Sequence, residues 1–371
     1  MNKTSCGNVN YLMEPGMRNM LLSVFEPGIR RGSVILVVLF AIGSSAYSGN
    51  PDPLFSSDEV VRMELRADFS SIQKNRTENQ ESFPGELIYY NKEGGEIALP
   101  VKVSARGNFR LKPENCSFPP LLVDFKKETV KNTLFENQNR LKLVTPCQGE
   151  EDVIEEYLIY RLYNLVTDYS FRVRLVKVLY YDTNSEAILF ERYSFFIEDR
   201  DNMDERNNAT VTEKFLTPFD LDYEGYKKLS VFQFLIGNID WYVTSRKNII
   251  VIQPNDNSLK PVAVPYDFDF SGLVNAFYSK PRGLTDQTVS YRRRYKGICY
   301  TEEELMQVFK YFRELKPRFR AVIKNEKALS GNARIEIMDY LNYSFSLLRS
   351  RAVRKEFLKT CETRELYNIK M

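Results

Sequence analysis

The sequence predicts an α+β fold of two lobes, the first rich in strands and the second mainly helical. Apolar and polar residues alternate through much of residues 55–200, as they do in half-buried strands. Apolar residues recur at helical spacing through much of residues 205–365. The polar stretch EDRDNMDERNNAT separates these two patterns, so we place the boundary between the lobes near residues 199–212.

The first lobe is expected to be β-rich, with one helix. GELIYYNKEGGEIALPVKVSARG has the pattern of a hairpin that turns at Gly94 and Gly95. The other expected strand segments are VVRMELRADF (60–69), PPLLVDF (119–125), RLKLV (140–144), FRVRLVKVLYYDT (171–183) and AILFERYSFFIED (187–199). The single helix is EEDVIEEYLIYRLYNLVTD, in which an acidic first turn precedes apolar residues at helical spacing.

The second lobe is expected to consist mainly of helices with one hairpin among them. The expected helices are LSVFQFLIGNIDW (229–241), TEEELMQVFKYFREL (301–315), PRFRAVIKNEKAL (317–329) and the long segment 331–360. Each has an apolar face that requires a packing partner.

Composition limits the chemistry that the protein can perform. Histidine is absent from the 371 residues, which excludes Ser-His-Asp and Cys-His nucleophile systems and zinc sites built on histidine. The formal net charge of +3 gives no electrostatic case for binding nucleic acid. Any reaction must therefore depend on carboxylates, Lys, Arg, Tyr, Ser, Thr or Cys.

The N-terminal segment has the pattern of a signal peptide. The apolar run SVILVVLFAIG (33–43) follows Arg30 and Arg31, and small residues follow the run. The run has about half the roughly 20 residues that a spanning helix needs. We therefore expect residues 1–46 to be a signal peptide with an N-terminal extension. The protein would then be periplasmic, on the cell surface or secreted, with no permanent membrane span after cleavage.

Four cysteines follow this segment: Cys116, Cys147, Cys299 and Cys361. An even number of cysteines in an exported chain indicates disulfides, and three pairings are possible. We favour Cys116 with Cys147 and Cys299 with Cys361, because each pair then lies within one predicted lobe. Buried free thiols are the alternative.

A group of polar residues in apolar surroundings could perform phosphoryl transfer. Asp240 follows an apolar helix, Asn248 begins the next strand, and a second strand ends at Asp267 and Asp269. Transfer from ATP requires a carboxylate that orients the acceptor hydroxyl, together with oxygen ligands for Mg²⁺. Asp240 fits the first role as the catalytic residue. Asn248 and Asp267 fit the second, with Asp269 as a further metal ligand, although each residue alone could simply mark a turn.

These motifs resemble the catalytic region of the spore-coat protein H (CotH) kinase-like family. Asn238-Ile239-Asp240 and Tyr266-Asp267-Phe268-Asp269 are the matching residues, and ARGNFR (105–110) is similar to the family's Arg-Gly-Asn loop. The chain further resembles a group of uncharacterised secreted proteins of Bacteroidetes, through RGNFR, CSFPPLLVDF, RLKLVTPC, YRLYNLVTDYSFRVRLV and PYDFDFSGLVNA. The first resemblance implies a two-lobed atypical protein-kinase-like fold that binds ATP or another nucleotide with Mg²⁺ or Mn²⁺.

The same fold implies a lysine that contacts the nucleotide phosphates and a helix glutamate that holds it. Lys142 has the expected place on a strand, and Glu156 or Glu155 is its candidate partner. Lys126 and Lys127 also end a strand and are rivals. Arg106 and Asn108, in the Arg-Gly-Asn loop, are further candidates for binding phosphate oxygens.

We therefore expect an exported atypical kinase that transfers a phosphoryl group from a nucleotide to a hydroxyl acceptor on an exported protein or a glycan. The alternative is a non-catalytic, pseudokinase-like envelope protein that uses the site for binding or assembly. Two features favour the alternative. No Gly-rich phosphate loop is present, and ATP is scarce outside the cytoplasm.

Overall fold

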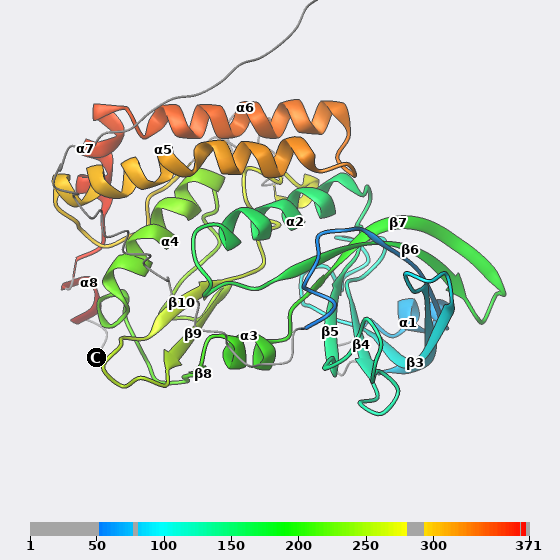
Figure 1. Cartoon of the computed structure of the whole chain (residues 1–371). Helices are drawn as coiled ribbons and strands as arrows, with labels where there is room; N and C mark the ends of the chain where they lie inside the picture. The colour runs from blue at the N-terminus through cyan, green and yellow to red at the C-terminus, as the bar shows by residue number, and fades with distance from the viewer. Residues whose placement is uncertain (1–51, 77–80, 280–292, 364, 369–371) are drawn as a thin grey trace, which may run out of the picture. The chain divides into compact units, whose positions relative to one another are not determined.

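The strands of the first half of the chain close into a barrel in the computed structural model, which describes residues 52–76, 81–279, 293–363 and 365–368 (Figure 1). The order around the barrel is β1-β2-β3-β4-β5-β7-β6. The strands are β1 (Val61–Ala67), β2 (Phe83–Tyr90), β3 (Glu96–Ala105), β4 (Leu121–Phe125), β5 (Arg140–Val144), β6 (Val173–Asp182) and β7 (Ala187–Ile197).

One parallel pairing closes this barrel. β1 pairs with β6 in parallel, from Val61 opposite Val176 to Ala67 opposite Asp182. The neighbouring pairs around the barrel are antiparallel. Side chains that alternate along the strands fill its interior, among them the fully buried Leu65, Val103 and Phe196.

The predicted two-lobed, protein-kinase-like fold is therefore wrong. In its described part, the first half of the chain forms a closed mixed barrel of seven strands, where a kinase-like β-rich lobe with one helix was expected. The hairpin expected in the second half is present as β9 (Ile249–Pro254) and β10 (Val262–Pro265), and β8 (Ala209–Val211) extends it to a three-stranded sheet in the order β10-β9-β8. Pairing between β1 and β6 joins distant segments, and alternation within each segment carries no signal for it.

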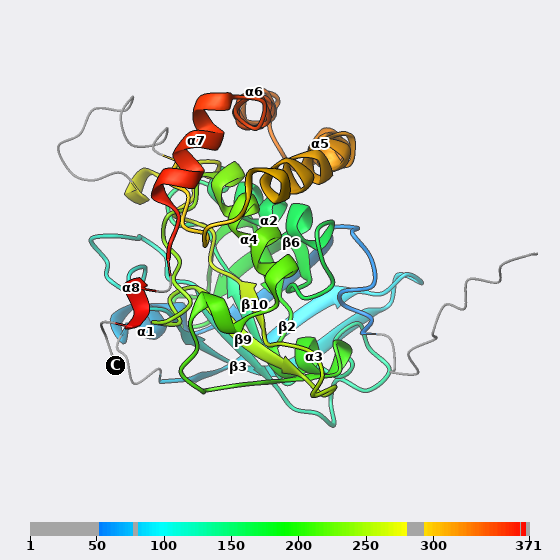
Figure 2. The same cartoon turned by 90° about the vertical axis from the view of Figure 1, so that its left-hand side faces the viewer.

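Helices cover one side of the barrel and the small sheet. Figures 1 and 2 show α5 and α6 side by side, with α4 and α2 beneath them. The larger elements here are α2 (Glu151–Asn164), α3 (Arg200–Arg206), β8 (Ala209–Val211), α4 (Tyr223–Ile236), β9 (Ile249–Pro254), β10 (Val262–Pro265), α5 (Glu302–Asn325), α6 (Gly331–Leu347) and α7 (Arg351–Thr360). The shorter ones are α1 (Phe69–Lys74), α8 (Glu365–Asn368) and the 3₁₀ turns Pro218–Asp220 and Phe277–Ser279.

The expected helices have different bounds in the structure. α4 covers Tyr223–Ile236, where a helix was expected at 229–241. α5 continues through Pro317, so the two helices expected at 301–315 and 317–329 are one. The helix expected at 331–360 is divided, because Ser350 caps a new helix by accepting a hydrogen bond from the backbone N–H of Val353.

Both predicted disulfides are confirmed. Cys116 is bonded to Cys147, and Cys299 is bonded to Cys361. Disulfides persist in oxidising compartments, so they indicate a location outside the cytoplasm. Among the described residues, no helix has the length and apolar character needed to cross a membrane. The signal peptide expected at residues 1–46 lies outside the described residues.

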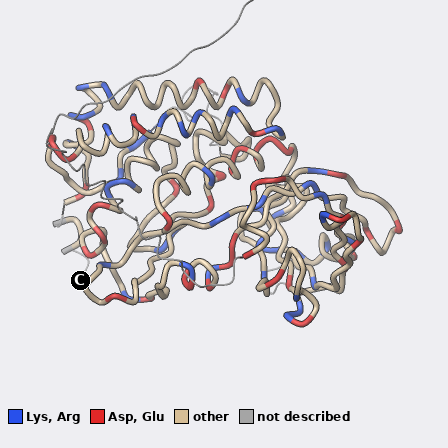
Figure 3. The backbone as a smooth tube through the Cα atoms, in the orientation of Figure 1, with Lys and Arg blue, Asp and Glu red and all other residues tan. Residues whose placement is uncertain are grey.

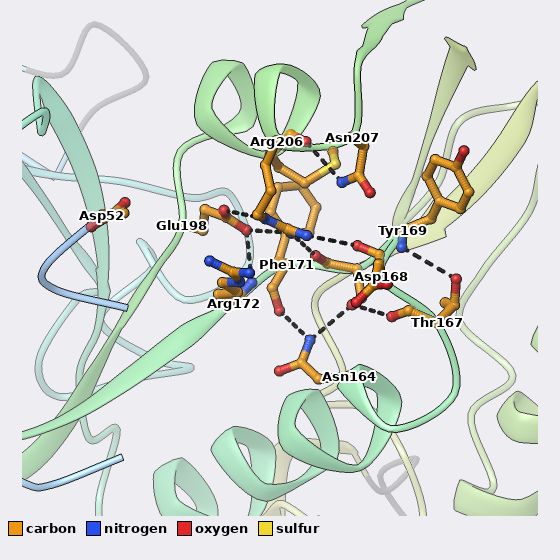
Figure 4. Close-up of polar contacts among 12 residues, drawn as sticks. Asp52, Asn164, Thr167, Asp168, Tyr169, Phe171, Arg172, Glu198, Arg206 and Asn207 are labelled. Atoms are coloured by element: carbon orange, nitrogen blue, oxygen red, sulfur yellow. Dashed lines mark hydrogen bonds and ion pairs between the residues drawn. The ribbon is translucent and has the colours of Figure 1, made fainter. Parts of the chain in front are cut away.

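Charged side chains of both signs are spread along the barrel and the helices (Figure 3). One buried group of charges joins the barrel to the segment that follows it. Figure 4 shows Glu198, at the end of β7, beside Arg206 of α3 and the backbone of residues 168–172. This contact fixes the point at which the chain leaves the barrel.

Candidate functional site

A cavity of about 90 Å³, partly open to solvent, lies where the barrel meets α2 and the segment after β10. Its walls come from the loop after β3, from β5, from α2 and from residues 266–270. Six of the residues selected from the sequence line it: Arg106, Asn108, Lys142, Glu156, Asp267 and Asp269. Four separate segments of the chain therefore bring basic and acidic side chains to one cavity.

The loop after β3 forms the basic wall of the cavity. The backbone N–H of Arg106 donates to Pro120 O at 2.9 Å, which holds the loop beside β4. Gly107 has a φ of 97°, a conformation that glycine adopts easily and that turns the loop into the cavity. The buried guanidinium of Arg110 donates to Thr145 O, while its Nε is buried without a hydrogen-bond partner. The loop thus presents two guanidinium groups near the cavity.

Lys142 occupies the floor of the cavity on β5, between Leu122 of β4 and Ile197 of β7. Its ammonium lies 5.5 Å from the centre of the Tyr266 ring. Burial, and next the positive charge of Arg106, lowers the pKa of Lys142 to about 8, although the negative charge of Asp267 opposes this shift. An anion in the cavity would stabilise the charged form of this lysine.

Glu156 projects from α2 but does not pair with Lys142 in the described structure. Its carboxylate accepts a hydrogen bond from the backbone N–H of Phe268 at 3.3 Å. Burial, followed by the negative charges of Asp269 and Asp267, raises the pKa of Glu156 well above its usual value. Glu156 therefore belongs to an acidic group rather than to an ion pair with the lysine.

The alternatives to Lys142 and Glu156 lie elsewhere. Lys126 and Lys127 are exposed in the turn after β4 and do not line the cavity. Glu155 is buried on α2 but also does not line the cavity, and burial raises its pKa to about 9. Lys142 and Glu156 therefore line the cavity, whereas the three alternative residues do not.

Asp267 and Asp269 form the acidic wall. Asp267 has a left-handed backbone with a φ of 60°, and its N–H donates to the hydroxyl oxygen of Tyr160 at 2.9 Å. Asp269 is buried, and its Oδ2 accepts a hydrogen bond from the hydroxyl of Tyr278 at 2.9 Å. Its Oδ1 is buried with no hydrogen-bond partner. Burial, and next the charge of Asp267, raises the pKa of Asp269 to about 8.

Asp240 and Asn248 lie together beside this acidic wall rather than in the lining of the cavity. The side-chain amide of Asn248 donates to Asp240 O at 2.8 Å and to Asp240 Oδ2 at 3.1 Å. The backbone N–H of Tyr266, next to Asp267, donates to Asn248 O at 3.1 Å. The charge of Asp240 contributes to the raised pKa of Asp269, so these two carboxylates are neighbours.

Two residues of this neighbourhood were not selected from the sequence. Lys247 forms an ion pair with Asp240 Oδ1, and Arg110 faces the buried carboxylates and opposes the rise in their pKa. Lys247 directly precedes Asn248, and Arg110 ends the ARGNFR motif. Their positions next to predicted site residues are the feature of the sequence that could have identified them.

The acidic wall suits a hard cation that also has ligands from elsewhere. No group of three His, Cys, Asp or Glu residues able to hold a metal ion occurs in the described part of the chain. Asp267 and Asp269 with the nearby Asn248 would supply oxygen ligands, and Mg²⁺ commonly completes its shell with water and phosphate oxygens. The partnerless buried Oδ1 of Asp269 fits this role, because a cation would compensate its charge.

A scan of protein-family models finds no match to this chain, and a search of curated proteins finds no significant relative.

Proposed function

We propose that the cavity binds a nucleotide together with Mg²⁺ or Mn²⁺, and that the protein transfers a phosphoryl group from this nucleotide to a hydroxyl acceptor. The observation that carries the proposal is the meeting of a basic wall and an acidic wall in one cavity. The phosphates of a nucleotide need basic side chains, and the metal ion that accompanies them needs acidic side chains.

Arg106 and Lys142 are the proposed phosphate-binding residues. Arg106 lies in the loop after β3, and Lys142 lies on β5. Burial lowers the pKa of both groups, and the charge of Arg106 lowers the pKa of Lys142 further. Two cations held close together in a partly buried site are stabilised when an anion binds between them. Asn108 of the same loop lines the cavity and would add a polar contact.

Asp267 and Asp269, with Asn248, are the proposed metal ligands. The chemistry that a bound Mg²⁺ supplies is neutralisation of the charge on the phosphate oxygens. Binding of the cation would also keep Asp269 ionised, because the pKa of its carboxyl is raised in the absence of a compensating positive charge. The resemblance of the Tyr266-Asp267-Phe268-Asp269 motif to the CotH family supports this assignment, although it does not extend to the fold.

Asp240 is the proposed catalytic residue. The acceptor oxygen would form a bond to the transferred phosphorus as the bond from phosphorus to the bridging oxygen breaks. The proton of the acceptor hydroxyl would pass to the Asp240 carboxylate. Asn248 and Lys247 hold the two oxygens of this carboxylate, which fixes its direction. Because the disulfides indicate an extracytoplasmic location, the acceptor would be an exported protein or a glycan.

The second candidate is a protein that binds a phosphorylated ligand without transferring phosphate. Two observations favour it. Lys142 and Glu156 do not pair in the described structure, and Glu156 instead accepts from the backbone of Phe268. Both carboxylate oxygens of Asp240 already have donors, and an acceptor hydroxyl would have to displace one of them.

Thermal unfolding with millimolar ATP or GTP, each with Mg²⁺ or Mn²⁺, tests the binding step. A ligand at 100 times its Kd stabilises the folded state by about 2.7 kcal/mol, so the melting temperature should rise by several degrees. Lys142→Met should remove this rise. Lys102→Met, which changes an exposed lysine on β3, is the matched control and should retain it.

Mass spectrometry of the protein and of added acceptors then tests the transfer step. A mass increase of one phosphoryl group that depends on Asp240 would support transfer. Binding that Lys142→Met abolishes, with no phosphoryl transfer to any acceptor, would favour the second candidate. An unchanged melting temperature with every nucleotide and metal would contradict nucleotide binding and, with it, the proposed phosphoryl transfer.

A further inference from the structure

The basic run Arg293-Arg294-Tyr295-Lys296 has some side chains at the surface and others in the interior. Arg294 is exposed, and Arg293 donates to Ser344 Oγ at 2.7 Å. Lys296, by contrast, is only 7% exposed. A lysine buried to this degree needs partners for its ammonium, and those partners show what the residue does.

The ammonium of Lys296 holds the backbone carbonyls of the two residues that flank Asp240 in the sequence. It donates to Ile239 O at 2.6 Å and to Trp241 O at 3.1 Å. It also lies 3.4 Å from the centre of the Tyr242 ring. We propose that Lys296 is a positioning residue, which fixes the loop that carries Asp240 and thereby directs the Asp240 carboxylate toward the acceptor.

The other contacts that hold this loop come from nearby in the sequence, among them the hydrogen bond of 2.8 Å from the Asn248 side chain to Asp240 O. Gly237, with a left-handed φ of 68°, ends α4, and the backbone N–H of Asp240 donates to the side chain of Asn238 at 2.9 Å. Those contacts are local, whereas Lys296 reaches the loop from a distant segment. An ammonium has three donors and can donate to two carbonyls at once, whereas the methionine side chain, which is of similar length, has no donor.

The segment that carries Lys296 is itself anchored. The hydroxyl of Tyr226 donates to Lys296 O at 3.4 Å, and Gly297 O accepts from the backbone N–H of Glu362 at 3.0 Å. The Cys299–Cys361 disulfide joins the same two segments. The rigid support that a positioned catalytic group requires is therefore present behind Lys296.

Lys227 provides a matched control in the same part of the protein. It is 2% exposed, its ammonium contacts Glu224 at 2.7 Å, and it lies near the rings of Tyr223 and Tyr300. None of its contacts in the described structure is to the loop of Asp240. Lys227→Met therefore removes a buried ammonium from the helical region without removing a contact to this loop.

Hydrogen exchange of the ligand-free protein tests the proposal directly. Lys296→Met should speed exchange of the amides in residues 238–242 by about 10- to 100-fold, as expected for loss of a charged hydrogen bond. Lys227→Met should leave exchange of these amides at the wild-type rate. Wild-type exchange in Lys296→Met, or equal acceleration in both variants, would overturn the proposal.

If Lys296→Met does not fold, NMR of wild-type protein with ¹⁵N-labelled lysine replaces it. The ammonium protons of Lys296, assigned by their absence in Lys296→Arg, should exchange slowly with water because two carbonyls hold them. Rapid exchange of these protons would contradict the proposal.

The catalytic consequence rests on the proposed function. Lys296→Met should lower kcat by about 100-fold, the effect of a small misplacement of a reacting group, with little change in the KM for nucleotide. An unchanged kcat would show that Lys296 does not position Asp240. The exchange experiment needs no nucleotide, so a wild-type protein that binds none would contradict the proposed function without altering that result.

Discussion

The guanidinium of Arg206 forms a bidentate ion pair with the carboxylate of Glu198. Arg206 Nε lies 2.9 Å from Glu198 Oε1, and Arg206 Nη2 lies 2.9 Å from Glu198 Oε2 (Figure 4). The side chain of Glu198 is 2% exposed and also accepts from the backbone N–H of Arg172 at 2.9 Å. Arg206 further donates to Asp168 O at 3.0 Å and Ser170 O at 2.7 Å. One ion pair thus joins β7, α3 and the chain entering β6.

Glu198→Gln should lower the free energy of unfolding by about 3 kcal/mol, because it leaves the charge of Arg206 uncompensated in a mostly buried site. Urea denaturation measures this change. Glu191→Gln is the control on the same strand. Glu191 pairs with Arg62 at 3.4 Å, both side chains are well exposed, and we expect a loss of about 0.5 kcal/mol or less. Equal losses in the two variants would contradict the role of the buried pair.

Asp269 should make the stability of the metal-free protein depend on pH. Because burial and the charge of Asp267 raise the pKa of Asp269 to about 8, the folded state holds a proton that the unfolded state releases near the usual value of 3.8. The protonated Asp269 therefore contributes to the free energy of unfolding. This contribution is complete below a pH of about 3.8 and is lost as the pH rises toward about 8.

Asp269→Asn should therefore increase stability at pH 8 by on the order of 1–3 kcal/mol, and have little effect at pH 4. Chemical denaturation at both pH values, in the presence of a chelator, measures this difference. Asp339→Asn, which changes an exposed carboxyl on α6, should have no such effect. If Asp269→Asn were less stable than the wild type at pH 8, the negative charge of Asp269 could not be uncompensated in the folded protein.

Local patterns in the sequence were sufficient to predict much of the secondary structure and the disulfides. The hairpin that turns at Gly94 and Gly95 is present as β2 and β3, because alternation and turn residues act within a short segment. Closure of the barrel depends on Leu65 and its neighbours in β1 lying beside β6. That pairing is decided by the assembled core, which no single segment encodes.

The candidate site shows the same division. The order of Asp240, Asn248 and Asp267 along the chain was enough to predict that they lie together, since each follows or begins a regular element. The direction of a long side chain was not predictable. Nothing in the basic run distinguishes buried Lys296 from exposed Arg294, because only packing against the loop of Asp240 separates them.

Nucleotide binding should weaken as the pH rises through about 8. Burial and the charge of Arg106 lower the pKa of Lys142 to about 8, so this lysine loses its proton there and its attraction for phosphate. Lys142→Arg should remove the effect, because arginine stays charged at this pH. Isothermal titration between pH 6.5 and 9 with a magnesium nucleotide measures it. A wild-type Kd that is constant over this range would contradict the assignment of Lys142.

Asp267→Ala should abolish the metal dependence of nucleotide binding without unfolding the protein. The Asp267 side chain is exposed, and the hydrogen bond to Tyr160 comes from its backbone, which the substitution retains. Melting temperatures with nucleotide, with and without Mg²⁺, measure the effect. Asp256→Ala, at an exposed turn after β9, is the control. Unchanged Mg²⁺-nucleotide affinity in Asp267→Ala, in Asp269→Ala and in the double variant would show that this segment is only a turn.

Asp240→Asn gives opposite results under the two proposed functions. If Asp240 accepts the proton of an attacking hydroxyl, the amide keeps the shape of the side chain but loses its basicity. Turnover should then fall by about 10²–10⁴-fold, the range of positioned acid–base groups, while nucleotide affinity barely changes. If Asp240 only stabilises its loop, asparagine replaces it well, and stability should change by about 0.5 kcal/mol or less.

The control for Asp240→Asn is Asp222→Asn. Asp222 caps the N-terminus of α4, the helix that leads to Asp240, and its side chain accepts from the backbone N–H of Gly225 at 2.7 Å. Asparagine caps helices about as well as aspartate, so this variant should keep both stability and activity. Steady-state phosphoryl transfer by the two variants and the wild type measures the difference. Full activity in Asp240→Asn would remove Asp240 from the reaction, because the amide cannot accept the proton of the attacking hydroxyl.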